Sequence, residues 1–175
     1  MHMRNGMVGF VVLGILAAAA SARFEPQAVS AKVRVGTYDS RAIALAYAPS
    51  KYNPVAEKMR EHAAAKAAGN TKRVKELEAW GEKHQRSLHR QGFGRVPVDD
   101  LLAAVQTHLP EVAAKTGVDV IAMSCDYQGA NVELVDVTDE LVRLFEPSER
   151  TLGYVKDLKQ RPPVDLDELG PGHDD

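Results

Sequence analysis

The sequence contains few of the residues that most often reveal a protein's chemistry. Cys125 is its only cysteine, so no intrachain disulfide can form. In a short strand, such a cysteine is more often a small buried side chain than a reactive group, although pairing with another subunit stays open. No His-Glu-x-x-His motif, nucleophile elbow or phosphate-binding glycine loop occurs. We therefore expect a protein that is not an enzyme, with no catalytic residue, bound metal or cofactor.

The remaining candidates for catalysis are weak. His62, His84, His89 and His108 are potential bases, but His84 and His89 are five residues apart and do not share one helix face. The segment Ser124-Cys125-Asp126 places a nucleophile beside an acid without any motif around it. Core or turn roles explain these residues better than catalysis does.

Long hydrophobic runs are scarce, and the one near the start of the chain indicates export. Arg4 precedes an uncharged run of 13 residues, Val8 to Ala20, and Ala20-Ser21-Ala22 follows as a cleavage site. A bilayer-spanning helix needs about 20 residues, so a signal peptide over 1–22 is favoured over an uncleaved anchor. No cysteine follows the small residues, which argues against a lipoprotein.

Neither sign of charge dominates the whole chain, whose net charge is −2, but the two signs are separated. Residues 51–95 carry 11 basic and 5 acidic side chains, whereas residues 96–175 carry 6 basic and 17 acidic ones. This pattern predicts two electrostatic surfaces with different partners. Nucleic acid is not an expected partner of an exported acidic protein.

The hydrophobic pattern predicts short strands at both ends of a helical segment. Residues 31–38 alternate, with Val33, Val35 and Thr37 on one face, and a helix capped by Ser40 follows. Residues 54–91 have the composition of a solvated helix, interrupted at Gly69-Asn70-Thr71, where we expect a reversal with Thr71 as the cap. The alternative position for the tip is Gly92-Phe93-Gly94. The second half carries a weak seam of Val74, Leu77, Gly81, His84 and Leu88.

A second set of elements closes the chain. We expect a helix kinked by Pro110 and ended by Gly117, a strand over 118–124 buried on both faces, and a strand over 132–137. A helix capped by Thr138 follows, and residues 146–175 form an acidic, proline-containing tail that we expect to be disordered. Because three short strands make a marginal sheet, the core should be completed by association of subunits.

Three segments resemble the Skp/OmpH family of periplasmic chaperones. They are VRVGTYDS near the start, LLAAVQTHLPEVAAKTGVDVIA in the second half, and VELVDVTDELVRLF near the end, and the resemblance covers roughly residues 31–145. It implies an α+β fold with a small β body over 31–50 and 112–145 and a projecting helical hairpin arm over 51–111. Asp39 and the segment 136–138 would then be turn and cap residues.

The resemblance also implies a homotrimer in the periplasm that holds unfolded outer membrane proteins between its arms without ATP. The strands would be pooled into an oligomer core formed by Val33, Val35, Val118, Val120, Ile121, Val132 and Leu134. The alternative is a structural or envelope-tethering trimer that holds no client.

Basic residues of the arm are the candidate client-facing group. They would attract acidic clients or an anionic lipid surface over a Debye length of about 8 Å. The simpler interpretation is that these charges only solvate a helix. The candidates are Lys58, Arg60, Lys66, Lys72, Arg73, Lys75, Lys83 and Arg86.

Overall fold

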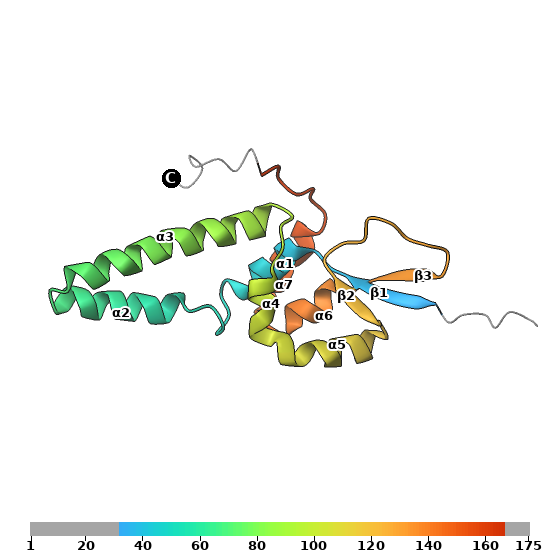
Figure 1. Cartoon of the computed structure of the whole chain (residues 1–175), viewed down its shortest axis with the longest axis horizontal. Coiled ribbons are helices and arrows are strands. Elements are labelled where there is room, and N and C mark those ends of the chain that lie inside the picture. Colours follow the sequence, from blue (N-terminus) through green and yellow to red (C-terminus); the bar gives the residue numbers. More distant parts are fainter. Residues whose placement is uncertain (1–31, 167–175) are drawn as a thin grey trace, which may run out of the picture. The chain divides into compact units, whose positions relative to one another are not determined.

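A computed structural model describes residues 32–166, which form a mixed α+β fold (Figure 1). The predicted signal peptide lies outside these residues. In chain order the elements are β1 (Val33–Thr37), α1 (Ser40–Tyr47), α2 (Val55–Ala67), α3 (Thr71–Phe93), α4 (Asp99–Leu102), the 3-10 helix η1 (Ala103–His108), α5 (Leu109–Thr116), β2 (Val120–Ala122), β3 (Val132–Asp136), α6 (Thr138–Arg143) and α7 (Glu149–Leu158).

The three short strands form one sheet in the order β2-β1-β3, with both outer strands parallel to β1. Val35 lies opposite Val120 on one side and Leu134 on the other. Because side chains alternate along a strand, laterally paired residues point to the same face of the sheet. The pairing therefore divides the strand residues into two faces. One face carries Val33, Val35, Val120, Val132 and Leu134, and the other carries Gly36, Ile121 and Val135.

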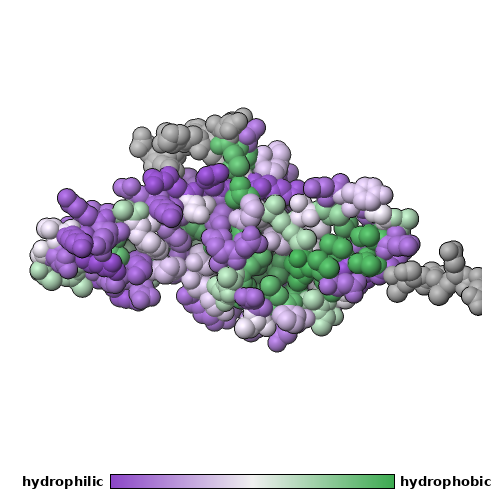
Figure 2. All heavy atoms as spheres, viewed as in Figure 1, coloured by the Kyte–Doolittle hydropathy of each residue, from purple (hydrophilic) through white to green (hydrophobic). Residues whose placement is uncertain are grey.

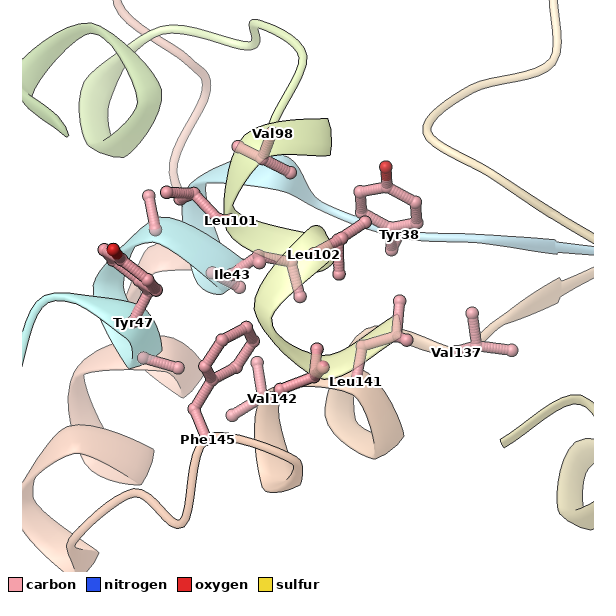
Figure 3. Packing of buried hydrophobic residues seen from close by; sticks show 14 of the residues in the cluster. Tyr38, Ile43, Tyr47, Val98, Leu101, Leu102, Val137, Leu141, Val142 and Phe145 are labelled. Carbon is pink, nitrogen blue, oxygen red and sulfur yellow. The ribbon is translucent and has the colours of Figure 1, made fainter. Parts of the chain in front are cut away.

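The helices pack on the second face and build a hydrophobic core within one chain. Ile43 of α1, Leu101 of α4, and Leu141 and Phe145 from α6 and its end converge there (Figure 3). Gly36 lets β1 approach this layer, since a Cβ on it would lie 2.9 Å from Cγ1 of Val137. The expectation that the core depends on neighbouring subunits is therefore wrong for this side of the sheet.

The strand predicted over 118–124 is shorter and more exposed than expected. β2 comprises three residues at the edge of the sheet, and Val120 is 50% exposed, so the prediction of burial on both faces is wrong. Val118 precedes the strand and is buried in the core. Cys125 follows the strand in a loop, where it is half-buried and its thiol donates to the carbonyl of Tyr127.

The helix expected over residues 97–117 is divided into α4, η1 and α5. Pro110 lies in the first turn of α5, where its missing N–H leaves no helical hydrogen bond unmade. Gly117 ends α5 in the left-handed region at φ 65°, as predicted for this position. The guanidinium of Arg34 donates to the carbonyls of Thr116 and Gly117 at 2.9 and 2.7 Å, which joins β1 to the end of α5.

Helices α2 and α3 pack side by side and are joined at Gly69-Asn70 (Figure 1). Gly69 has φ 67°, and the Asn70 side chain accepts from the backbone N–H of Arg73, so Asn70 caps α3 where Thr71 was expected. The tip is therefore at Gly69-Asn70, because α3 continues to Phe93. The predicted arm boundary at residue 111 is too late, since Val98 and Val105 are fully buried in the core.

The chain remains ordered well past residue 146, where a disordered tail was expected. Ser148 caps α7 by accepting from the backbone N–H of Thr151, and α7 packs against α1 with Val155 buried. Further along, the carbonyl of Arg161 accepts from the buried guanidinium of Arg41 at 3.0 Å. The disorder prediction is therefore wrong for 149–158, and residues 167–175 lie outside the described part.

Candidate functional site

The carboxyl end of a parallel sheet is where open α/β proteins usually bind ligands. Asp39 lies there after β1 and Asp136 ends β3. Burial alone would raise the pKa of the Asp39 carboxyl, but two hydrogen bonds from Arg41, at 3.0 and 2.6 Å, hold this pKa below its usual value. Both oxygens of Asp39 are therefore occupied within the chain.

The carboxylate of Asp136 is likewise bound by groups of the same chain. Burial opposes ionisation, but the backbone N–H of Thr138 at 2.9 Å and the ammonium of Lys159 at 2.9 Å lower the pKa of the Asp136 carboxyl. Lys159 also contacts Asp139 at 3.1 Å. These two acids therefore have the contacts of turn and cap residues.

The first face of the sheet, which we call the open face, is not covered by any helix of residues 32–166. Val33 is 46% exposed, Val120 50% and Leu134 38%. Figure 2 shows apolar residues gathered over the region that the strands occupy in Figure 1. Parallel sheets occur almost only with both faces covered, so this exposed apolar surface is unusual. It has the character of a surface that is buried against another protein.

The structure divides the predicted oligomer-core residues between the two faces. Val33, Val35, Val120, Val132 and Leu134 share the open face. Val118 is buried, and the partly buried Ile121 packs against the chain's own core, so neither shares the open face. The sequence pattern could not separate these two from the others, because they are equally apolar.

A groove of about 460 Å³ lies between α2 and α3. Its apolar lining includes Met59, which is 68% exposed, and Leu77, which is buried. Gly81 has no atom within 4 Å of where a Cβ would stand, so it leaves this part of the groove open. The expected seam of α3 supplies one wall, with Leu77, Gly81, His84 and Leu88. Sequence analysis missed Met59 and Trp80, which supply the largest apolar side chains.

Aromatic stacking organises the floor of this groove. The rings of Trp80 and His84 stack with centroids 4.8 Å apart and an angle of 14° between their planes. Nε2 of His84 lies 2.9 Å from Oδ1 of Asn53, which ties α3 to the segment before α2. Burial lowers the pKa of His84, against the attraction of the Asp100 carboxylate. A neutral imidazole that donates to Asn53 therefore completes an apolar, aromatic surface.

The other described histidines, His62, His89 and His108, lie in separate local contacts. His62 lies 3.4 Å from Glu78, His108 lies 3.6 Å from Glu111, and His89 packs edge-on against Phe93. Within residues 32–166, no three His, Cys, Asp or Glu side chains are close enough together to hold a metal ion.

The predicted client-facing basic residues fall into two groups. Lys58 and Arg73 pair with Glu61 at 2.9 and 3.0 Å, and Arg73 also pairs with Glu76 at 2.9 Å. The pair of Arg73 with Glu61 joins α3 to α2, whereas the other two each lie within one helix, so Lys58 and Arg73 are partly neutralised by the hairpin itself. Arg86 lies 4.0 Å from Glu82. The other five have no ion pair among the described residues: Arg60, Lys66, Lys72, Lys75 and Lys83.

Exposed cations follow one side of α3. A helix turns by about 100° per residue, which places these positions within a strip less than a quarter of the circumference wide. The strip lies opposite the side that carries Leu77 and Leu88. We call it the basic stripe, and it consists of Lys72, Lys75, Lys83, Arg86 and Arg90.

Comparison of the chain with protein-family models, curated proteins and solved structures yields no significant match. Among residues 32–166, none of the helices combines the length and the apolar character needed to span a bilayer.

Proposed function

We propose that this protein is an ATP-independent holdase chaperone of the Skp/OmpH kind, exported to the periplasm by a cleaved signal peptide. The observation that carries the proposal is the α2–α3 hairpin, which combines an open apolar groove on one side of α3 with exposed cations on the opposite side, most of which have no ion pair among the described residues. Its clients are unfolded outer membrane proteins, which expose apolar and charged segments together. The sequence resemblance over residues 31–145 supports this choice of client.

The proposed oligomer is a homotrimer joined through the open face. Three copies that bring together Val33, Val120 and Leu134 would remove from water the apolar surface that no helix covers. The helix-covered side already has a core of its own, so each subunit can fold before it associates. The trimer would then carry three hairpins around a shared cavity.

Holding would combine two weak interactions. The groove offers Trp80 and Met59, and a flexible methionine side chain adapts to different apolar partners. The basic stripe attracts acidic segments over about a Debye length, ~8 Å at physiological salt, and the lysine stems add apolar contact. The same cations would permit contact with an anionic lipid surface. Many weak contacts retain an unfolded chain without selecting one sequence.

The test is suppression of aggregation. An unfolded β-barrel membrane protein is diluted from urea into buffer with and without the purified protein, and light scattering is followed without ATP. We expect suppression at stoichiometric amounts at low salt. An unchanged scattering trace at every protein ratio would sink the proposal.

Two variants separate the two interactions. The combined change Met59→Ala and Trp80→Ala should weaken holding at all salt concentrations, because it removes apolar lining. The combined change Lys72→Glu, Lys75→Glu and Lys83→Glu should weaken it most at low salt, and it leaves the Arg73 pairs intact. Lys156→Glu on α7, which reverses a single charge away from the hairpin, is the control and should hold like the unaltered protein.

The mass of the protein in solution distinguishes the remaining alternative. A trimer that does not suppress aggregation would be a structural or envelope-tethering protein built on the same body. If the protein suppressed aggregation as a monomer, holding by the groove and the stripe would be supported, but the proposed cavity between three hairpins would be wrong.

A further inference from the structure

The last described residues are fixed beside the C-terminal end of α3 (Figure 1). The backbone N–H of Val164 donates to the carbonyl of Phe93 at 3.0 Å. Leu166 packs so closely on Gly94 that a Cβ on this glycine would collide with Cδ2 of Leu166. Together with the hydrogen bond from Arg41 to the carbonyl of Arg161, these contacts hold residues 161–166 beside the C-terminal end of α3.

The basic stripe begins at that place. Arg90 is the residue one turn before Phe93, and Arg86 and Lys83 follow toward the hairpin tip. These three cations line a hollow of about 390 Å³, to which Val96 and Pro97 contribute an apolar part. A peptide with carboxylates and small apolar side chains fits this lining in charge and in polarity.

Residues 167–175 have that composition. They include Asp167, Glu168, Asp174 and Asp175, together with Leu169 and Pro171, and contain no lysine or arginine. An extended segment of nine residues spans about 30 Å. From Arg90 to Lys83 the helix rises only about 10 Å. The segment is therefore long enough to lie along the part of the stripe between Arg90 and Lys83.

We propose that residues 167–175 dock on Lys83, Arg86 and Arg90 of the same chain and compete there with anionic ligands. Tethering at Phe93 gives the segment an effective concentration in the millimolar range, so individually weak ion pairs are sufficient. Docking rests on the described contacts and the charges alone. The competition for clients rests in addition on the proposed function.

Docking is tested by energy transfer from Trp80, the sole tryptophan. The acceptor, a dansyl group, is attached to His173→Cys in a Cys125→Ser background of the full chain. Transfer should be efficient at low salt and fall as salt rises. It should also fall when Arg86 and Arg90 are both changed to Glu. If the efficiency of energy transfer changed neither with salt nor in the Arg86→Glu, Arg90→Glu variant, the docking would be wrong. This outcome does not depend on whether the protein holds clients.

Competition is tested by neutralising the segment with Asp167→Asn, Glu168→Gln, Asp174→Asn and Asp175→Asn. Binding to vesicles of equal phosphatidylglycerol and phosphatidylcholine should strengthen at least about threefold at low salt. The control, Glu149→Gln with Asp157→Asn on α7, should bind like the unaltered protein. Equal binding by the neutralised and unaltered proteins would overturn the competition. If holding of clients fails while salt-sensitive transfer persists, the proposed function is wrong and the docking stands.

Discussion

The backbone N–H of Asp39 donates to Oγ1 of Thr138 at 3.0 Å, across 99 positions of the sequence. This bond joins the end of β1 to the first residue of α6. Thr138 is 1% exposed, and the preceding N–H of Val137 donates to the carbonyl of Thr37 at 2.9 Å. The Asp-Val-Thr segment thus fastens the carboxyl end of the sheet to the helical layer.

The change Thr138→Val should destabilise the protein by about 1–3 kcal/mol. Valine preserves the shape but leaves the N–H of Asp39 without an acceptor in a largely dry place. Urea unfolding followed by circular dichroism measures the free energy of unfolding. Thr138→Ser restores an acceptor and should recover most of the loss. Equal loss in both variants would assign the effect to packing.

The change Ser40→Ala should leave the stability unchanged or raise it by about 1 kcal/mol. The hydroxyl of Ser40 is fully buried and has no hydrogen-bond partner among the described residues, while Asp39 caps α1. Removing a buried polar atom without a partner removes a desolvation cost, and alanine favours the helix. The same urea titration is the measurement, and a clear loss of stability would contradict this interpretation.

The changes Val120→Glu and Leu134→Glu should each dissociate the proposed trimer without unfolding the subunit. Both side chains lie on the open face and are not part of the core. A buried carboxylate at the interface would be strongly unfavourable. Sedimentation equilibrium gives the mass and circular dichroism the fold. Gln106→Glu adds a charge on exposed η1 and should leave the mass unchanged.

The stability should fall more steeply below neutral pH in the unaltered protein than in His84→Gln. Burial lowers the pKa of His84 in the folded state from its ordinary 6.5, so protons bind preferentially to the unfolded chain. The contribution of the neutral imidazole is present above that ordinary pKa and is lost as the pH falls through the folded pKa. Urea midpoints between pH 8 and pH 5 measure the difference. His108→Gln, on an exposed side chain, is the control, and parallel curves for His84→Gln and the unaltered protein would refute the prediction.

Local sequence patterns predicted the elements better than their partners. The alternation of Val33, Val35 and Thr37, the reversal at Gly69-Asn70 and the end of α5 at Gly117 are all confirmed. These features depend on a few neighbouring residues. The helix α7 was missed because Gly153 and the surrounding charges weaken its pattern, and its packing against α1 is not visible in the local sequence.

The candidate surfaces could be predicted only in part. Charge counting found the basic residues, but not all of their partners, because the pair of Arg73 with Glu61 depends on how α2 packs against α3. The stacking of Trp80 on His84 depends on the conformations of both side chains, and the spacing of the two residues in the sequence does not determine these conformations. Val118 is buried and Val120 is exposed, and this difference depends on where β2 begins.

The central position of β1 sets the order in which this molecule can fold. Both of its neighbours in the sheet come from residues 120–136, so a growing chain has no partner for its first strand until most of its length has appeared. The α2–α3 pair, by contrast, is closed by a short turn and can form early. We expect the hairpin to be present before the sheet closes, which would leave an intermediate with paired helices and an unpaired, aggregation-prone β1.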